Sequence, residues 1–316
     1  MYESYFGFRE PPFGLTPDPS YFYAGASYQE ALNTLLVAAH NGEGFIKIVG
    51  EVGNGKTMLC RTFLHSLQKP LGSDISDANG EDAAVLGEIA TEVQAQVAAK
   101  PRFITAYIPN PYIDPRGLLV ALAEEFEVPV NPGGDLHQLV KSVTAGLMKI
   151  AEGGQRALVC LDEVQAMPQH TLEAVRLLTN LETEKRKLLQ VVLLGQPELE
   201  ERLRQRSTRQ LLQRITFQCT IAGLRKEEVS EYLLHRLKVA GFKGRFPFTS
   251  SAVKAFHSAS GGVPRLVNIL AHKTLMLAYG EGVREITGKH VRMAADDTPA
   301  ADRPKAGILS WLQLHR

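Results

Sequence analysis

The sequence has few features of a secreted, metal-binding or membrane protein. Its three cysteines, Cys60, Cys160 and Cys219, stand far apart and show neither metal-ligand nor redox spacing. No basic segment followed by an apolar run opens the chain, and no apolar stretch reaches the roughly 18–20 residues of a membrane helix. These absences argue against a disulfide framework and a membrane span. We therefore expect a cytoplasmic protein with buried thiols.

A strong overall charge is also missing, because the net charge of the 316 residues is +1. The distribution is less even. Residues 225–316 hold 15 basic and 8 acidic side chains, whereas residues 1–224 hold 20 and 26. The basic last third permits contact with an acidic partner, and a solvated surface explains it equally well.

The most informative stretch is a short apolar run, residues 45–49, followed by Gly-x-x-x-x-Gly-Lys-Thr and a helical pattern. This strand, loop and helix order is that of a phosphate-binding loop. Its glycines allow amide N–H groups to turn inward around phosphate, and the helix N-terminus adds positive charge. We expect Lys56 to reach the β- and γ-phosphates of a nucleoside triphosphate and the Thr57 hydroxyl to bind Mg²⁺. The candidate nucleotide-binding residues are Gly50, Glu51, Val52, Gly53, Asn54, Gly55, Lys56 and Thr57.

Further apolar runs alternate with helical patterns along the chain. Strands are expected at 103–108, 157–161, 190–196 and 215–219, and helices from about 115, from about 135, and over 171–183 and 202–213. Runs that are apolar on both faces are typical of the middle of a parallel sheet. The alternation predicts an α/β fold, with helices on both faces of a parallel sheet. After residue 224 only helical patterns remain, at 227–240, 250–258, 263–279 and 287–295, and these predict a small all-helical domain.

The expected domain organisation follows these changes in pattern. Residues 1–26 form an aromatic, proline-rich arm, 27–224 the α/β core, 225–295 the helical domain and 296–316 a tail. Because proline disfavours helix and central strand, we expect the arm to lie over the domain without either. It either packs there only or lines an adenine pocket beside the phosphate loop. Within the core, residues 71–100 are an acidic insertion, read as a loop over 71–83 and a surface helix over 84–99.

Two acids follow the buried run at 157–161. An enzyme with a phosphate loop needs an acid at the tip of a neighbouring strand to hold Mg²⁺, and Asp162 has that position. Glu163 beside it is the candidate that orients or deprotonates the attacking water. Gln196 follows the next strand and is placed to contact a γ-phosphate, although an amide that caps the turn before Pro197 is an equal alternative.

Arginines supply the remaining candidates. Five occur between residues 202 and 214 with no lysine among them, and arginine offers a fixed fork suited to phosphate. The functional interpretation is an arginine finger that acts on a neighbouring subunit, with Arg214 as the first candidate and Arg209 as the second. Structural salt bridges are the alternative for each of them. Arg265 follows a proline that fixes the start of a helix. From that position in a lid domain, we expect its side chain to reach back to a γ-phosphate.

Taken together, these motifs resemble the AAA+ ATPases of bacterial secretion and pilus biogenesis. The nearest groups are general secretion pathway protein A (ExeA-type) and the MSHA pilus biogenesis protein MshM. The resemblance covers about residues 1–295, and its opening segment is more specific than the phosphate loop. It is carried by residues 5–8, 12–13, 16–19, 50–57, 107–111, 161–163, 195–199, 210–215 and 262–265.

The resemblance implies a P-loop NTPase core followed by a lid, with ATP and Mg²⁺ bound between the subunits of a homo-oligomer. It assigns Asp162 and Glu163 as the Walker B acids, Gln196 and Arg265 as the two sensors and Arg214 as the finger. It also implies an ATPase that assists assembly of a pilus or secretion machine, with partners at the inner membrane. Since secretion-type members continue into a membrane helix and a peptidoglycan-binding region, we expect the soluble, MshM-like branch.

Two other functions are compatible with the same core. One is a DNA-binding AAA+ regulator of the transposition or replication type, for which the basic residues 225–316 are the only support. The other is a scaffold that binds ATP and turns it over slowly. Nucleic acid is therefore a possible partner, though not the favoured one.

Overall fold

The computed structural model describes residues 2–16, 18–68, 103–109, 112–178, 181–182 and 187–301. The expected acidic insertion at 71–100 and the part of the tail from residue 302 onward lie outside these residues. The chain divides into two compact units. The sheet unit comprises Ala31–Val49 and Leu59–Thr220, and the loop–helix unit comprises Met1–Glu30, Gly50–Met58 and Ile221–Arg316.

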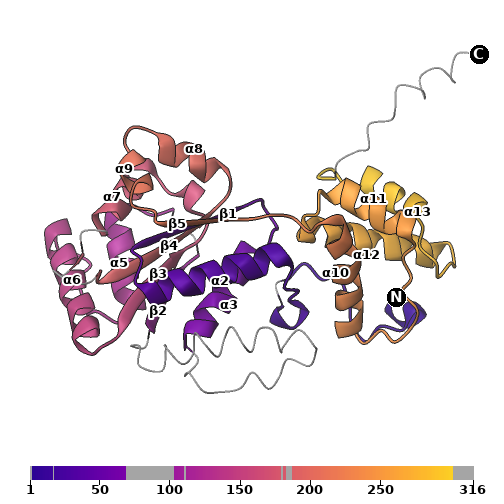
Figure 1. Cartoon of the computed structure of the whole chain (residues 1–316), viewed down its shortest axis with the longest axis horizontal. Helices are drawn as coiled ribbons and strands as arrows, with labels where there is room; N and C mark the ends of the chain where they lie inside the picture. The colour runs from indigo at the N-terminus through magenta and orange to yellow at the C-terminus, as the bar shows by residue number, and fades with distance from the viewer. Residues whose placement is uncertain are drawn as a thin grey trace, which may run out of the picture. The chain divides into compact units, whose positions relative to one another are not determined.

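A five-stranded sheet organises the sheet unit (Figure 1). Its strands are β1 (Phe45–Gly50), β2 (Phe103–Ile108), β3 (Arg156–Leu161), β4 (Leu189–Gly195) and β5 (Phe217–Ile221). The order across the sheet is β2-β3-β4-β1-β5. β2 pairs in parallel with β3, β3 with β4, and β4 with β1, whose Val49 lies opposite Gly195. The carboxyl ends of these strands therefore meet at one edge of the sheet.

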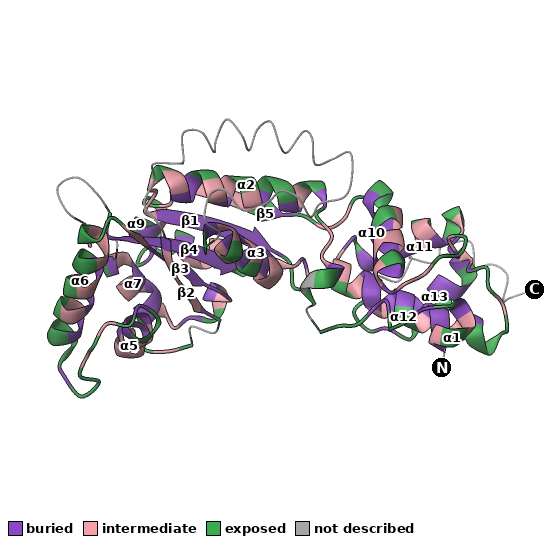
Figure 2. Cartoon of the chain, turned by 90° about the horizontal axis from the view of Figure 1, so that it is seen from below, coloured by how far each residue is buried: buried purple, intermediate pink, exposed green. Residues whose placement is uncertain are grey.

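Burial of the central strands explains why they are largely apolar. Every residue of β1 and β4 is buried, as the continuous purple of these strands in Figure 2 shows. This confirms the prediction of a parallel α/β sheet with its middle strands covered on both faces. The exception in β1 is Lys47, whose buried ammonium forms a 3.0 Å ion pair with Glu200.

Helices cover both faces of the sheet. α2 (Ala26–Asn41) lies on one face, and α5 (Pro115–Glu125), α6 (Leu136–Glu152) and α7 (Gln169–Leu178) lie on the other (Figure 2). α5 and α6 begin where expected, because the Asp114 and Asp135 carboxylates accept hydrogen bonds from the first-turn amides of Gly117 and Gln138. A hydrophobic core joins these three helices to the strands.

Some elements differ in their bounds from the sequence prediction. α7 ends at Leu178 rather than at 183, and β5 starts two residues later than expected. The arginine-rich stretch is not one helix but two short ones, α8 (Glu198–Arg204) and α9 (Arg209–Leu212). The break follows from an extended Gln205 and from the buried Thr208, whose hydroxyl donates a hydrogen bond to the Arg202 carbonyl oxygen. Apolar spacing alone does not reveal such a local side-chain bond.

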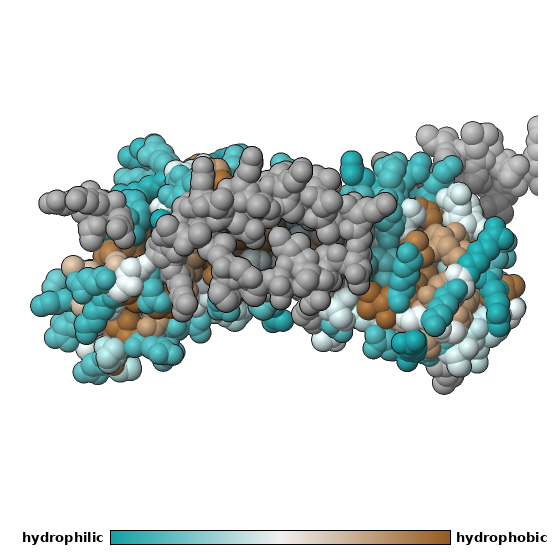
Figure 3. Space-filling view, turned by 60° about the horizontal axis from the view of Figure 1, so that its bottom comes forward, coloured by the Kyte–Doolittle hydropathy of each residue, from teal (hydrophilic) through white to brown (hydrophobic). Residues whose placement is uncertain are grey.

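The last third of the described chain folds as the predicted helices. They are α10 (Lys226–Val239), α11 (Ser250–Ser260), α12 (Pro264–Gly280) and α13 (Gly288–Asp296). No helix among the described residues is both long and apolar enough to cross a membrane. On the face drawn in Figure 3, apolar side chains reach the surface in patches between polar ones.

The N-terminal segment packs against these helices. It contains the short helix α1 (Tyr2–Phe6), which the prediction of an arm without helix missed because the prolines begin only at residue 11. α1 lies beside α12 (Figure 2). Five aromatic residues of the segment belong to the core of the helical domain: Tyr2, Phe6, Phe8, Phe13 and Tyr21. Arg236 of α10 contacts the segment at two points. Its Nε donates a hydrogen bond to the Pro12 carbonyl oxygen, and its guanidinium lies 4.4 Å from the Tyr21 ring centre.

Candidate nucleotide site

The phosphate loop, residues 50–57, connects β1 to helix α3 (Lys56–Gln68). Gly53 and Gly55 have φ angles of 89° and 87°, a region that side-chain-bearing residues rarely adopt. A Cβ placed on Gly55 would meet no atom within 4 Å, so this side of the loop is open. The loop therefore offers an open backbone surface directly before a helix N-terminus, which suits an anion.

The side chain of Lys56 is turned into this loop. It is 5% exposed, and its ammonium donates to the carbonyl oxygens of Gly50 at 2.7 Å and Glu51 at 3.1 Å. A buried ammonium held by the loop's own carbonyls lies next to the backbone that would bind phosphate. The role of Lys56 as the cation for the β- and γ-phosphates remains a prediction.

Contacts from two other segments of the loop–helix unit fix the loop. The Asn54 side chain donates to the Ile221 carbonyl oxygen at 2.9 Å. The Arg265 amide donates to the Gly53 carbonyl oxygen at 3.4 Å, and a Cβ on Gly53 would lie only 2.7 Å from the Arg265 Cβ. The start of α12 thus lies directly against the phosphate loop. Arg265, a residue expected to contact phosphate, is exposed at this point.

The two acids follow β3 in the sheet unit. Asp162 is 1% exposed, and its Oδ1 accepts the Glu163 amide at 2.9 Å. Its Oδ2 accepts the Tyr107 hydroxyl at 3.1 Å. Burial and, next, the negative charge of Asp162 raise the pKa of Tyr107 well above its usual value, so this hydroxyl keeps its proton. Asp162 is therefore a buried carboxylate with a fixed orientation.

Glu163 has an unusual backbone and a well-defined side chain. Its φ of 54° is in the left-handed region, which costs a residue with a side chain about 1 kcal/mol or more. Its Oε2 accepts hydrogen bonds from Gln165 Nε2 at 2.5 Å and from Gln196 Nε2 at 2.9 Å. The structure thus brings together Glu163 and Gln196, and the Gln196 side chain contacts the acid instead of capping the turn before Pro197.

The arginines between residues 202 and 214 differ in exposure and in their contacts. Arg214 and Arg209 are exposed, and Arg214 lies at the amino-terminal edge of the sheet, since Thr216 bonds to Phe45 at the start of β1. Arg202 donates to the Gln165 carbonyl oxygen and Arg204 pairs with Glu200 at 3.5 Å, so these two have structural partners.

The available ligands fit a nucleotide with Mg²⁺ better than a metal held by protein alone. Among the described residues, no group of three His, Cys, Asp or Glu side chains is placed to hold a metal ion. Mg²⁺ is usually bound through one or two protein oxygens together with phosphates and waters. The Asp162 carboxylate and the Thr57 hydroxyl are donors of that kind.

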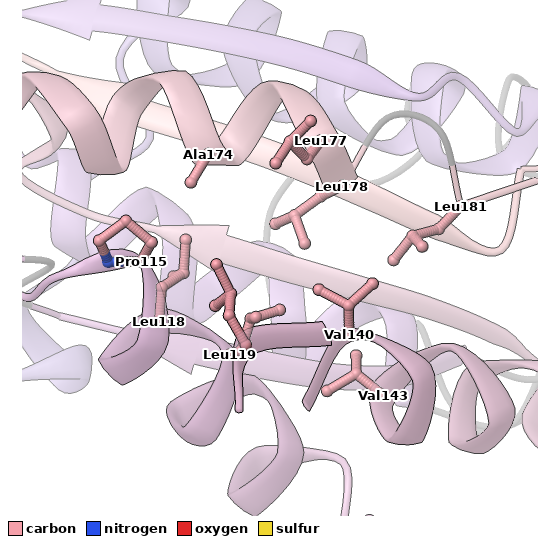
Figure 4. A pocket seen from close by; sticks show the side chains of 10 residues that line it. Pro115, Leu118, Leu119, Val140, Val143, Ala174, Leu177, Leu178 and Leu181 are labelled. Atoms are coloured by element: carbon pink, nitrogen blue, oxygen red, sulfur yellow. The ribbon is translucent and has the colours of Figure 1, made fainter. Parts of the chain in front are cut away.

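The sheet unit also has an apolar pocket. It lies between α5, α6 and α7, and all ten residues that line it are apolar (Figure 4). A triphosphate would find no charged or hydrogen-bonding side chain there, so this pocket is not a second nucleotide site.

Tyr107 and Gln165 were not predicted as site residues, although residues 107–111 carry part of the family resemblance. Tyr107 is in β2 and pairs in register with Cys160, two residues before Asp162, but that register is not legible in the sequence. Gln165 follows Glu163 by two residues in the 3₁₀ helix η2 (Val164–Ala166), and its proximity to the two acids was the one available signal.

Comparison with known proteins adds family information to this geometry. The sequence profile of the AAA domain family matches residues 39–203. General secretion pathway protein A of Aeromonas hydrophila is 37% identical over 295 residues, which cover 93% of this chain and 48% of that protein. The chain thus spans about half the length of this relative.

Two proteins of known structure have a similar fold. The ORC2 protein of Aeropyrum pernix aligns with a TM-score of 0.59 at 14% identity, over 91% of this chain and 71% of that one. Cdc6p of Pyrobaculum aerophilum aligns with a TM-score of 0.57 at 15% identity, over 89% of this chain and 71% of that one. At such identities the likeness concerns the fold. The profile match covers more than half of the chain and shows that the chain belongs to the AAA domain family of P-loop NTPases.

Proposed function

We propose that the chain is a Mg²⁺-dependent ATPase. The observation that carries this proposal is the open glycine loop with the buried ammonium of Lys56 at the start of α3. Residues 50–57 bind the triphosphate through backbone amides, and Lys56 neutralises charge on the β- and γ-phosphates. Thr57 and Asp162 hold the metal ion, which supplies charge stabilisation to the phosphates when bound.

Hydrolysis needs a group that takes a proton from water. Glu163 has that role in our proposal, since its carboxylate is oriented by two amides. Water attacks the γ-phosphorus, the bond to the bridging oxygen breaks with its electron pair on ADP, and the water proton passes to Glu163. Gln196 and Arg265 contact the γ-phosphate.

Arg214 acts on a neighbouring subunit in this proposal, with Arg209 as the second candidate. Arg214 is exposed at the amino-terminal edge of the sheet, and its proposed role is to reach the nucleotide bound by a second copy of the chain. An arginine supplied in this way stabilises charge in the transition state. The active form is accordingly a homo-oligomer.

Two proposals can be tested in one assay: that the chain hydrolyses ATP, and that its site is shared between subunits. The assay measures phosphate release from ATP by the purified chain over a range of protein concentrations. We expect turnover that requires Mg²⁺, stops when EDTA removes it, and rises per subunit as the chain oligomerises. A chain that releases no phosphate at any concentration would refute the ATPase proposal. Equal turnover per subunit for a dilute monomer and an oligomer would refute the shared site alone.

The cellular role that we propose is assistance in assembling a secretion or pilus machine at the bacterial inner membrane, through partners there. The similarity to General secretion pathway protein A supports it. Deletion of the gene should block secretion or pilus assembly, and the wild-type gene should restore it, whereas a Glu163→Gln gene should not. ATP-dependent retention on duplex DNA that falls steeply with salt would instead favour a DNA-binding regulator.

A further inference from the structure

The side chain of Gln165 bridges the ends of two neighbouring strands. Its Nε2 donates to Oε2 of Glu163, which follows β3, at 2.5 Å. Its Oε1 accepts the backbone amide of Gln196, which follows β4, at 3.0 Å. One amide group thus uses both its donor and its acceptor to join the proposed base to the residue proposed to contact the γ-phosphate.

The two hydrogen bonds to Glu163 reach the same carboxylate oxygen. Gln165 and Gln196 both donate to Oε2, and no described residue donates a hydrogen bond to Oε1. A carboxylate held in this way has one oxygen occupied and the other free to accept a proton. Gln196 retains a second N–H, because an amide nitrogen carries two donors.

The surroundings of Gln165 hold it in place. Its backbone carbonyl oxygen accepts a hydrogen bond from the Arg202 guanidinium of α8. Gly195, the last residue of β4, leaves room for it, since a Cβ there would lie 3.2 Å from Gln165 Oε1 and 2.6 Å from Leu199 Cδ2. The bridge therefore depends on packing from α8 and the end of β4 as well as on its own two hydrogen bonds.

We propose that Gln165 is a positioning residue for ATP hydrolysis. It fixes Glu163 with Oε2 occupied, so that Oε1 is the atom that accepts the proton of the attacking water, and it holds Gln196 in register with Glu163. The inference rests on the proposed ATPase function. It assigns Gln165 no contact with the nucleotide, so its effect falls on turnover and not on nucleotide affinity.

Two substitutions test the bridge. Gln165→Met removes both hydrogen bonds, and Gln165→Glu keeps the shape but replaces the donor with a carboxylate that repels Glu163. For both we expect kcat to fall about tenfold or more, with the KM for ATP and the melting temperature close to those of the wild type. The matched control is Gln169→Glu, four residues further on. It removes the hydrogen bond that the Gln169 side-chain amide donates to the Ser207 hydroxyl, and turnover should not change.

A double substitution separates positioning from general damage. Glu163→Asp keeps a carboxylate but withdraws it from both amides, so adding Gln165→Met should lower turnover no further. Additive losses, a parallel rise in KM, or melting well below the wild type would assign Gln165 a structural role and overturn the inference. Wild-type kcat in Gln165→Met would also overturn it and leave the ATPase proposal intact. Absence of hydrolysis by the wild-type chain would overturn both.

Discussion

The two units of the chain hold their functional residues in different ways. In the loop–helix unit the phosphate loop is fixed through its backbone, because Gly53 contacts the start of α12 and Asn54 reaches the Ile221 carbonyl oxygen. In the sheet unit the acids are fixed through side chains. Asp162 accepts a hydrogen bond from the Tyr107 hydroxyl, and Glu163 accepts hydrogen bonds from the side-chain amides of Gln165 and Gln196. The first arrangement suits binding of phosphate by amides, and the second suits control of individual carboxylate oxygens.

This difference suggests that the loop–helix unit determines nucleotide binding and the sheet unit determines turnover, and mutations can separate the two. Damage to the loop should remove nucleotide binding, whereas damage to the side-chain network should leave binding and reduce turnover.

Arg214→Ala is expected to have the largest effect on turnover, because an arginine finger contributes about 10³-fold or more. Nucleotide affinity should remain that of the wild type, and Arg206→Ala in the same arginine-rich stretch is the control. Steady-state phosphate release and binding of a fluorescent ATP analogue measure the two quantities.

Mixing subunits sharpens that test. Arg214→Ala subunits keep their phosphate loop, and Lys56→Ala subunits keep their finger, so a mixture of the two inactive variants should regain activity. If Arg214 served its own subunit, or served no nucleotide, the mixture would stay inactive.

Lys56→Ala should weaken ATP binding at least 100-fold, which corresponds to about 2.8 kcal/mol. The physical reason is the loss of the buried ammonium beside the loop backbone. Isothermal titration with ATP and Mg²⁺ checks it, with the exposed Lys141→Ala of α6 as the control. An unchanged dissociation constant would place the triphosphate elsewhere.

The ion pair between Lys47 and Glu200 should stabilise the sheet unit independently of nucleotide. Glu200→Gln leaves the buried ammonium of Lys47 without its carboxylate and should cost about 2 kcal/mol, whereas Lys47→Met with Glu200→Gln should recover most of it. Urea denaturation measures both variants. Equal losses in the single and double variants would show that the pair contributes through packing alone.

The same pair predicts a pH dependence. The hydrogen bond from Lys47, and next its charge, lowers the pKa of Glu200 from the usual 4.5. A lowered pKa stabilises the fold above the unfolded value, and this contribution disappears as the pH falls through the folded value. The stability difference between wild type and Glu200→Gln should therefore be full at pH 7 and shrink below about pH 4.5.

Tyr107→Phe is expected to have the smallest effect, about tenfold in the Mg²⁺ concentration needed for half-maximal turnover. It removes the hydroxyl that orients Asp162 but leaves the ring in place. Because the pKa of Tyr107 is raised, the wild-type hydroxyl should keep donating through the ordinary tyrosine range near pH 10, which a magnesium titration at pH 7 and pH 9.5 examines. A drop in wild-type magnesium affinity between those values, absent from Tyr107→Phe, would contradict the assignment.

Much of the fold and the phosphate loop could be predicted because their causes are local. Glycine spacing, the lysine before a helix and acids at the end of an apolar run are all set by neighbouring residues, and the described structure has Lys56 and Asp162 in the expected positions. The helices α10 to α13 were likewise legible from their apolar spacing.

The remainder depends on contacts between distant segments. The bond from Tyr107 to Asp162 exists because β2 pairs with β3 in one register among several. Gln165 meets Gln196 because β3 and β4 are neighbours in the sheet. The break between α8 and α9 depends on one hydroxyl, that of Thr208, turning back to Arg202. The spacing of apolar residues along the chain predicts none of these three contacts.

The most direct test of the account is Glu163→Gln, assayed side by side for ATP affinity and for phosphate release. This change keeps the shape of the side chain and removes its ability to take a proton. We predict a dissociation constant for ATP within about twofold of the wild type and a loss of turnover of about 100-fold or more. Turnover close to the wild-type rate, with ATP bound normally, would contradict the central claim that the sheet unit supplies the base through Glu163.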